Sequence, residues 1–415
     1  MGRPTVLALV LAGGEGSRME ILTERRAKPA LPFAGVYRLI DLPLSNLRNS
    51  AIDDVWVAAQ YEVQSVVDVV AGGRPWDLDR THGGLRFLTP EQRRDLDDEE
   101  GWHEGNADAI YQSRELIRQF APDVLLVLSA DHVYRLNFAD VVTAHLDRDA
   151  DLTIVSTRVP IEQARHHGVI EVDADGRVTG FAHKPEDPPS DVVTTEVFAY
   201  RTSAILDTLE ALAGKLGDGT QTNLGDFGEH LVPALVERGS VFDFRLEGYW
   251  KDLGRPETYF EAHMDLLDGL PGLELDDPLW PVFTRDHQRL PARIRSGALV
   301  EDSLVSPGCV VAGTVRHSVL GPGVTVAADA VVENAVVLTD VEIREEAEVR
   351  YAIVDQDAVI GKGALVGETP PGKVTTDNLV LVGMGAHVRG RRKLRAGERV
   401  EPDTARRLPH PPTAR

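Results

Sequence analysis

The sequence predicts an α/β domain with a mostly parallel sheet, followed by a left-handed parallel β-helix. Two continuous apolar runs, at 6–12 and 123–128, have the length and composition of buried parallel strands. The first run ends in a glycine turn and the second is followed closely by an aspartate. After residue 291, aliphatic residues recur every six positions with small residues and glycines between them. That period is typical of a β-helix, whose stacked coils bury one continuous core.

Length and composition limit the class of protein. A chain of 415 residues is long enough for two or three domains. The formal net charge of −22 argues against nucleic acid or an anionic membrane as a partner. The single cysteine, Cys309, excludes an intrachain disulfide and fits a reducing cytoplasm. No apolar stretch has the length needed to cross a bilayer, and we interpret the apolar N-terminus as a strand rather than a signal peptide.

The remaining elements follow from patterning. The run 55–59 reads as a second strand, 63–70 as an amphipathic helix and 152–159 as a further strand. The polar, charge-rich segment 72–101 is expected to be a solvated loop with some helix. We place the α/β domain at 1–268, a proline-rich linker at 269–291, the β-helix at 292–388 and a basic, proline-containing tail at 389–415.

Three glycines break the chain after the first strand. Such residues allow a tight turn and present backbone N–H groups to an anion, and the cations Arg18 and Lys28 follow, both able to meet phosphate. Met19 stands where a dinucleotide-binding fingerprint has its third glycine, and no Gly-Lys-Ser/Thr closes a P-loop. An ordinary strand-to-helix turn is the alternative. The glycines are Gly13, Gly14 and Gly16.

Two polar residues stand at predicted strand ends. Asp131 follows the strand at 123–128, which places a carboxylate at the carboxyl edge of the sheet, where open α/β sheets bind ligands. A helix N-cap aspartate is the alternative. Gln60 closes the strand at 55–59, and its carboxamide offers a donor and an acceptor that can meet a base edge. The alternative for Gln60 is a polar strand-end residue without a ligand.

Three stretches together resemble one family: LAGGEGSR at 11–18, RAKPALPFAG at 26–35 and RLIDLPLSN at 38–46. They are similar to bacterial ADP-glucose pyrophosphorylase (glucose-1-phosphate adenylyltransferase), and the similarity continues along most of the chain into the repeat region. The resemblance implies a Rossmann-like nucleotidyltransferase domain. It also implies transfer of AMP from ATP to glucose 1-phosphate, giving ADP-glucose and pyrophosphate for glycogen or α-glucan synthesis. The implied assembly is a cytoplasmic homo-oligomer, a tetramer.

The resemblance also assigns the nucleotide side of a site. It implies that Gln60 contacts adenine and that Arg18 and Lys28 meet the nucleotide phosphates and the leaving pyrophosphate. The segment GNADA at 105–109 resembles the family's G-T-A-D-A turn, with Asn106 in place of Thr. His103 stands where the family has an aromatic residue near the sugar or base. The turn's implied nucleotide-binding residues are Gly105, Asn106 and Asp108.

The metal assignment likewise comes from the resemblance. LSADHVY at 128–134 is similar to the family's metal-binding G-D-H-Y segment, with Ala130 in place of glycine. YWKDLG at 249–254 is similar to its Y-W-x-D-V-G-T segment. These matches imply that Asp131 and Asp252 bind Mg²⁺, an ion that prefers oxygen ligands. No general base is required, because the attacking phosphate oxygen is already ionised.

On the sugar side, the resemblance implies that Gly168, Lys184 and Thr194 contact the sugar phosphate. Lys184 is the implied phosphate ligand, and Pro185 is expected to keep it extended. The chain departs from the family at His183, next to Lys184, which replaces a glutamate, and at Glu196, which replaces a glycine. A carboxylate near a sugar phosphate repels it unless it turns away or pairs with a cation, and His183 is the first candidate cation.

Three alternatives stay open, the first of them because of the departures at His103, His183 and Glu196. One is the same reaction on another hexose or a cyclitol 1-phosphate. A second is a weakly catalytic regulatory subunit or paralogue, against which the retained Arg18, Lys28, Asp131, Lys184 and Asp252 argue. The third concerns the repeats alone, because some proteins with such repeats are acyltransferases. The repeat region from 304 to 366 contains a single histidine, His317, and a lone histidine is more often structural.

Overall fold

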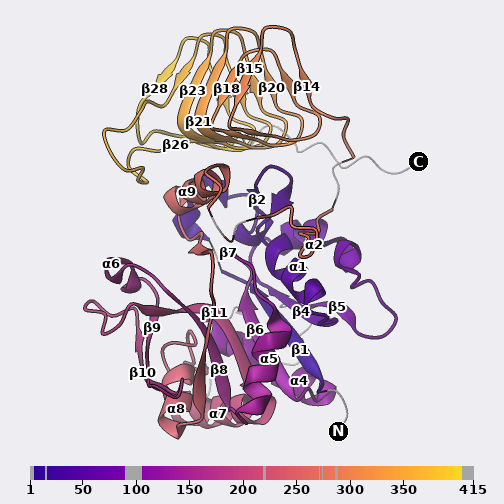
Figure 1. Cartoon of the computed structure of the whole chain (residues 1–415), viewed down its shortest axis with the longest axis vertical. Coiled ribbons are helices and arrows are strands. Elements are labelled where there is room, and N and C mark those ends of the chain that lie inside the picture. The colour runs from indigo at the N-terminus through magenta and orange to yellow at the C-terminus, as the bar shows by residue number, and fades with distance from the viewer. Residues whose placement is uncertain are drawn as a thin grey trace. The chain divides into compact units, whose positions relative to one another are not determined.

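The computed structural model describes residues 4–14, 16–88, 105–217, 221–270, 272, 274–285 and 288–403. The chain divides into two compact units, each described here by itself (Figure 1). The first contains Met1–Gly14, Ile40–Trp250 and Leu275–Phe283, and the second contains Glu15–Leu39, Lys251–Glu274 and Thr284–Arg415. Among the described residues, no helix combines the length and apolar character that crossing a membrane requires.

The first unit is built on a nine-stranded sheet within the described residues, with the main order β10-β9-β11-β6-β1-β4-β5 and with β8 and β12 joined through β11. Its strands are β1 (Val6–Ala12), β4 (Asp54–Ala59), β5 (Gly84–Leu88), β6 (Val124–Ser129), β7 (His132–Tyr134), β8 (Leu152–Arg158), β9 (Gly168–Val172), β10 (Val178–His183), β11 (Val192–Arg201) and β12 (Val241–Arg245), of which β7 lies outside this sheet. Its helices are α1 (Asp41–Asn49), α2 (Val63–Val70), the 3-10 helix η3 (Ala71–Trp76), α3 (Asn106–Gln112), α4 (Arg114–Phe120), α5 (Phe138–Asp147), α6 (Ile161–Ala164), α7 (Thr202–Leu216) and α8 (Leu231–Arg238).

The centre of this sheet confirms the predicted parallel arrangement. Strand β1 pairs in parallel with β4 on one side and with β6 on the other. Both apolar runs are buried, because their alternating side chains face helices on the two sides of the sheet. The sheet becomes antiparallel beyond β6, where β11 runs against β6, β8 and β9. The carboxyl ends of β1, β4 and β6 therefore form one edge.

The expectation of a loop at 72–101 is wrong for part of that segment. Gly84–Leu88 form β5, which extends the sheet in parallel with β4. The sequence did not indicate this strand, because it is short, lies between polar segments and mixes buried with exposed residues. Leu88 is buried and Arg86 is exposed. Residues 89–104, and with them His103, lie outside the described residues.

Part of the predicted linker packs back onto α1. The Trp280 indole N–H donates to Asn46 Oδ1 at 2.8 Å, and the Asn49 amide donates to the carbonyl of Pro281 at 3.0 Å. The same Asn46 side chain donates to the carbonyl of Tyr134 at 3.0 Å. Asn46, from the RLIDLPLSN motif, therefore joins α1, β7 and the segment Leu275–Phe283.

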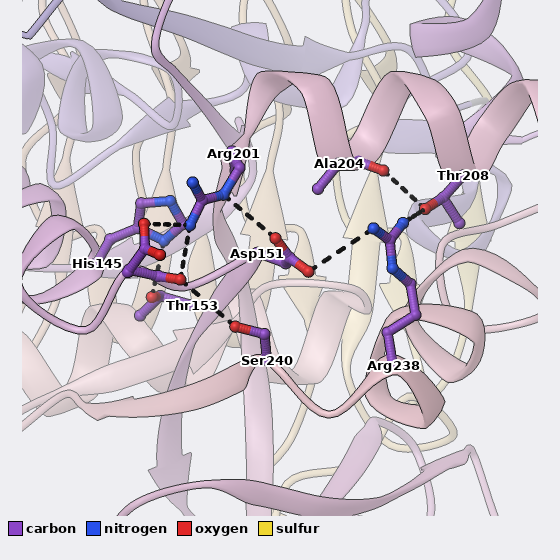
Figure 2. A network of polar contacts seen from close by, with 9 residues as sticks. His145, Asp151, Thr153, Arg201, Ala204, Thr208, Arg238 and Ser240 are labelled. Carbon is purple, nitrogen blue, oxygen red and sulfur yellow. Dashed lines mark hydrogen bonds and ion pairs between the residues drawn. The ribbon is translucent and has the colours of Figure 1, made fainter.

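A polar network lies at the amino ends of β6 and β8 (Figure 2). Asp151 forms two ion pairs. Its Oδ1 lies 3.2 Å from Arg201 Nε, and its Oδ2 lies 3.8 Å from Arg238 Nη2. His145 is buried and its Nδ1 lies 2.9 Å from the Thr153 hydroxyl. Burial, reinforced by the positive charge of Arg201, lowers the pKa of His145 from 6.5 to about 4, although Asp151 and Asp149 oppose the shift. The folded protein therefore keeps this histidine neutral.

The second unit contains a β-helix, one long helix and the loop that follows the first strand. Strand β13 (Trp250–Asp252) spans the boundary between the units. The other elements are the 3-10 helices η1 (Ser17–Leu22) and η2 (Lys28–Ala30), the strands β2 (Pro32–Phe33) and β3 (Tyr37–Arg38), and helix α9 (Pro256–Leu267). The repeat strands are β14 (Arg293–Ile294), β15 (Leu299–Glu301), β16 (Leu304–Val305), β17 (Val310–Val311), β18 (Thr314–Arg316), β19 (Val319–Leu320), β20 (Thr325–Val326), β21 (Val331–Val337), β22 (Glu342–Ile343), β23 (Glu348–Val354), β24 (Val359–Ile360), β25 (Leu365–Val366), β26 (Val380–Val382), β27 (His387–Val388), β28 (Lys393–Leu394) and β29 (Arg399–Val400).

The repeat strands pair in parallel between successive coils, as a left-handed β-helix requires (Figure 1). Val315, Val332 and Val349 stand in register and are fully buried. The expected phase fails at the start of the stack, because Leu304 is 38% exposed and the following residue, Val305, packs against the core. Beyond residue 388, where the sequence predicted a tail, β28 and β29 continue the stack, and residues 404–415 lie outside the described part.

Within the second unit, the loop 16–39 is tied to the β-helix. Arg26 and Asp355 are both buried and form a two-oxygen ion pair, and Arg26 also donates to Gln356 Oε1 at 3.1 Å. At the rim, Arg399 donates to the two carboxylate oxygens of Glu20 at 2.5 and 3.0 Å. The hydrogen bonds of such guanidinium–carboxylate pairs are charge-assisted and are roughly twice as strong as hydrogen bonds between neutral groups. The loop is therefore anchored to two coils of the β-helix, through Asp355 and Arg399.

We expect Asp355→Asn to destabilise the second unit by about 3–5 kcal/mol, because it leaves the buried Arg26 charge without its counter-ion. Asp340→Asn is the matched control, since Asp340 pairs with Arg289 on the same β-helix but both side chains are about one-third exposed. That change should cost about 1 kcal/mol or less. Urea unfolding of both variants checks the difference, and equal losses would contradict the anchoring role of Asp355.

We expect stability to fall as the pH decreases from about 6.5 to 4, because in this window the unfolded chain binds a proton that folded His145 excludes. The pKa difference corresponds to at most about 3 kcal/mol, present above pH 6.5 and lost toward pH 4. His145→Gln should flatten the acid side of the profile in urea unfolding measured between pH 7.5 and 4.5. The exposed His387→Gln is the control, and an unchanged slope in His145→Gln would refute the assignment.

Candidate active site

The carboxyl edge of the parallel strands brings three of the predicted residues together. Gly13 follows β1 and Gln60 follows β4, and these strands are paired to their last residues. A Cβ atom on Gly13 would lie 3.6 Å from Gln60 Cβ and 3.8 Å from Gln60 Oε1, so the two residues are direct neighbours. Asp131 follows β6, which pairs with β1 up to Ser129. Gly14 is exposed, and among the described residues no other group lies within 4 Å of a Cβ built on it, so the backbone there is accessible.

Asp131 stands in a cluster of polar side chains. The Ser129 hydroxyl donates to Asp131 Oδ1 at 2.5 Å, and His132 Nε2 lies 3.5 Å from the same oxygen. Glu196 Oε2 lies 3.9 Å from His132 Nε2. One ligand atom from each of Asp131, His132 and Glu196 lies within 4.8 Å of the others, an arrangement that can hold a divalent metal.

The structure corrects the expected partner of Glu196. The nearby histidine is His132, whereas the ring of His183 lies against the backbone of Gly228. Burial and the neighbouring Lys184 charge also lower the pKa of His183, which makes it a poor cation. Glu196 is directed toward Asp131 because β11 contains a bulge between Thr194 and Val197 and because Glu196 adopts a left-handed φ of 56°. The side chain therefore faces the cluster.

The residues assigned to the sugar side gather at one end of β9, β10 and β11. A Cβ atom on Gly168 would lie 3.1 Å from the Thr194 hydroxyl, and the backbone N–H of Lys184 donates to the carbonyl of His167 at 3.1 Å. The expectation that Pro185 keeps Lys184 extended is wrong, since Lys184 has a left-handed φ of 44°. The hydrogen bond to His167 holds this turn, and the Lys184 side chain is exposed.

The turn at 105–108 packs against a second loop of the same unit. The backbone N–H of Asn106 donates to Asp226 Oδ1 at 3.2 Å, and Gly105 lies against the backbone of Gly225 with a φ of 137°. Asp108 is buried and accepts a hydrogen bond from the Thr222 hydroxyl at 2.7 Å. The Asp108 carboxylate thus supports the loop, and its contact with a nucleotide stays a prediction.

In the second unit, Arg18, Lys28 and Asp252 lie close together. Lys28 is buried and its Nζ lies 3.6 Å from Asp252 Oδ1. A Cβ atom on Gly254 would lie 3.2 Å from both Asp252 oxygens and 3.5 Å from Arg18 Nη2. Gly16 has a φ of 67° and packs against Lys28 Cβ. The loop therefore holds one buried and one exposed cation beside a carboxylate.

Several neighbours within the candidate site were not predicted from the sequence. The motif at 128–134 contained His132, but its spacing did not show that the ring turns toward Glu196. The bulge that turns Glu196 cannot be recognised from the residue composition of β11.

His317 is the histidine of the acyltransferase alternative. Its Nε2 lies 3.0 Å from Asp268 Oδ1, and its Nδ1 lies 2.8 Å from Asn334 Oδ1. Its two ring nitrogens thus face structural partners in the second unit.

Family comparisons agree with this division of the chain. Residues 7–269 match the family described as nucleotidyl transferase, and residues 290–376 match the GlmU-like C-terminal hexapeptide family. The fold and the strand-end residues thus belong to a nucleotidyltransferase with a hexapeptide-repeat domain.

Relatives that match along most of this chain identify the particular nucleotidyltransferase family. A glucose-1-phosphate adenylyltransferase of Nitrosospira multiformis is 37% identical over 88% of this chain and 89% of the relative. One of Bacillus thuringiensis is 35% identical over 91% and 98%, and one of a Thermotoga species is 39% identical over 79% and 76%. The chain belongs to the glucose-1-phosphate adenylyltransferase family.

Proposed function

We propose that the protein transfers AMP from ATP to glucose 1-phosphate, which yields ADP-glucose and pyrophosphate. Family membership supports the reaction, and one observation supports the place where it occurs: Gly13, Gln60 and Asp131 follow three adjacent parallel strands at a single edge. Gln60 is assigned to adenine. The glycine turn and the loop 105–108 are assigned to the rest of the nucleotide.

The donor chemistry fits a magnesium cofactor. Asp131 and Asp252 offer carboxylate oxygens, and their side chains are partly exposed, by 23% and 22%. We assign both as Mg²⁺ ligands, and the ion would neutralise charge on the nucleotide phosphates. Arg18 and Lys28 are assigned to those phosphates and to the leaving pyrophosphate. Lys184 is assigned to the sugar phosphate, whose ionised oxygen attacks without a general base.

We further propose a cytoplasmic homotetramer that supplies ADP-glucose for α-glucan synthesis. The assembly is supported by aliphatic side chains that remain exposed at the first coils of the β-helix. Ile294 is 51% exposed, Leu299 is 39% exposed and Leu304 is 38% exposed. A coil end of this kind is expected to need a neighbour that covers it.

A second candidate is the same reaction on another hexose or a cyclitol 1-phosphate. The carboxylate of Glu196 beside Asp131 favours it, because a carboxylate can accept a hydrogen bond from a hydroxyl of one particular substrate. A panel of sugar 1-phosphates with ATP, GTP, UTP and dTTP, followed by pyrophosphate release, tests both candidates. Preference for ATP with glucose 1-phosphate supports the first, and turnover of another sugar alone supports the second. Absence of turnover with every pair supports a regulatory subunit.

We expect Asp131→Asn to lower kcat on the order of a thousandfold while the protein stays folded, because the substitution removes the charge of a metal ligand and keeps its shape. The control is Asp140→Asn, an exposed aspartate on α5 in the same unit, which should retain full activity. Steady-state pyrophosphate release and circular dichroism measure the two effects. Near-normal turnover of Asp131→Asn at saturating Mg²⁺ would remove Asp131 from the metal site.

We expect Lys184→Ala to raise KM for the sugar phosphate at least tenfold more than KM for ATP. A lysine that pairs with a phosphate contributes mainly uniform binding, which appears in KM. Lys215→Ala, which removes an exposed lysine of α7, is the control. Equal increases in both KM values would show that Lys184 is not selective for the sugar side.

A further inference from the structure

The cluster at the carboxyl end of β6 combines one imidazole with two carboxylates. We propose that Asp131, His132 and Glu196 form a protein-only site for a divalent cation, one that prefers Mn²⁺ or Co²⁺ to Mg²⁺. All three residues belong to the first unit, so the site is complete without nucleotide and without the second unit. It goes beyond the proposed function and shares with it the Asp131 carboxylate.

The buried histidine is oriented for metal binding. His132 is 2% exposed, and its Nδ1 lies 3.0 Å from the carbonyl oxygen of Thr195. A carbonyl oxygen can only accept, so Nδ1 carries a proton, and in the neutral form of the ring Nε2 presents its lone pair. That atom lies 3.5 Å from Asp131 Oδ1 and 3.9 Å from Glu196 Oε2. Such a hydrogen bond from the distal nitrogen to a carbonyl is the common support of a metal-binding histidine.

The electrostatics of the cluster favour a positive charge between the three side chains. A lone pair and two carboxylates that lie within 4.8 Å of one another repel in the absence of a cation. A divalent ion between them converts the repulsion into attraction and accepts all three donors. A proton on Nε2 is the competing solution, and it would leave an imidazolium between the carboxylates.

The backbone of β11 positions the third donor. The register of β11 against β8 shifts between Thr194 and Val197, which leaves Thr195 and Glu196 in a bulge. The Thr195 hydroxyl donates to the carbonyl of Val155 at 2.9 Å and fixes the bulge. One irregularity therefore supplies both the carbonyl that orients His132 and the carboxylate that faces it. A bulge commonly aims a side chain in this way.

Aromatic packing limits rotation of the histidine. The Trp250 ring lies edge-on to His132, with ring centroids 5.4 Å apart and an interplanar angle of 83°. His167 contacts the same indole, with centroids 5.2 Å apart. The imidazole is thus held in place before any ligand arrives, which lowers the cost of ordering it on metal binding.

The donor set decides which cation is favoured. Mg²⁺ selects oxygen ligands and keeps several waters, whereas Mn²⁺ and Co²⁺ bind carboxylates and, with increasing strength along the series, imidazole nitrogen. One nitrogen and two carboxylates therefore favour the transition ions. The carboxylate of Glu196 is 49% exposed, which leaves an open side of the site to water or phosphate oxygen.

Metal titration of the full-length chain tests the site without substrates. After removal of metals with EDTA, Co²⁺ is added in the absence of nucleotide and followed by visible absorption, and Mn²⁺ is followed by the paramagnetic resonance of the free ion. We expect one equivalent to bind, with Mg²⁺ competing only at large excess. Glu196→Gln and His132→Gln should each weaken binding by about 10–100-fold. Glu171→Gln, which alters an exposed glutamate of β9, should bind as the wild type does.

Two outcomes would overturn the proposal. One is a wild-type protein that binds neither Co²⁺ nor Mn²⁺ without nucleotide, the result expected if a protonated His132 bridges the carboxylates. The other is Glu196→Gln that binds as tightly as the wild type. Glu196 lies at the surface, so this variant carries the test even if His132→Gln fails to fold by circular dichroism. Failure of the proposed function is separate, since it appears as absent pyrophosphate release in a protein that still binds Co²⁺.

Discussion

The buried pair of Arg26 and Asp355 is the constraint on which the second unit depends. Both charges are removed from water, so each is tolerable only while the other is in place. The segment around Arg26 is short in regular structure and contains two 3-10 helices rather than a long helix. Its position is therefore set by contacts with the β-helix. Because this segment also carries Arg18 and Lys28, the β-helix helps to fix the cations assigned to the nucleotide phosphates.

Much of the fold follows from sequence patterns with a direct physical cause. Buried parallel strands are apolar along their whole length, which made β1 and β6 recognisable. The six-residue period predicted the β-helix because each flat face of a coil contributes one inward-facing aliphatic residue per six-residue repeat. Parallel strands end at a common edge, the rule by which Asp131 was expected there, and the structure shows Gly13 and Gln60 as neighbours at the ends of two of these strands. The roles of these residues toward a nucleotide stay predictions.

Contacts between residues that are distant in the sequence could not be predicted from comparable sequence patterns. Arg26 and Asp355 are separated by 329 positions, and nothing local to either residue indicates the other. The strand β5 is too short and too mixed in polarity to stand out from the loop around it. The bulge that turns Glu196 toward His132 depends on strand pairing, so chain proximity pointed instead to His183. Lys184 took a left-handed turn because the carbonyl of His167 is available to its N–H group.

The membership of Glu15–Leu39 in the second unit bears on how such chains can be recombined. In sequence this segment belongs to the N-terminal part, yet its anchors lie in the β-helix, at Asp355 and Arg399. A chimera that joins residues 1–268 to a foreign β-helix would inherit a buried guanidinium without its acceptor. Crossovers between these regions are therefore disfavoured unless both ends change together. The two domains look like separable modules, but substitutions in the first forty residues and in the last hundred or so are coupled through these contacts.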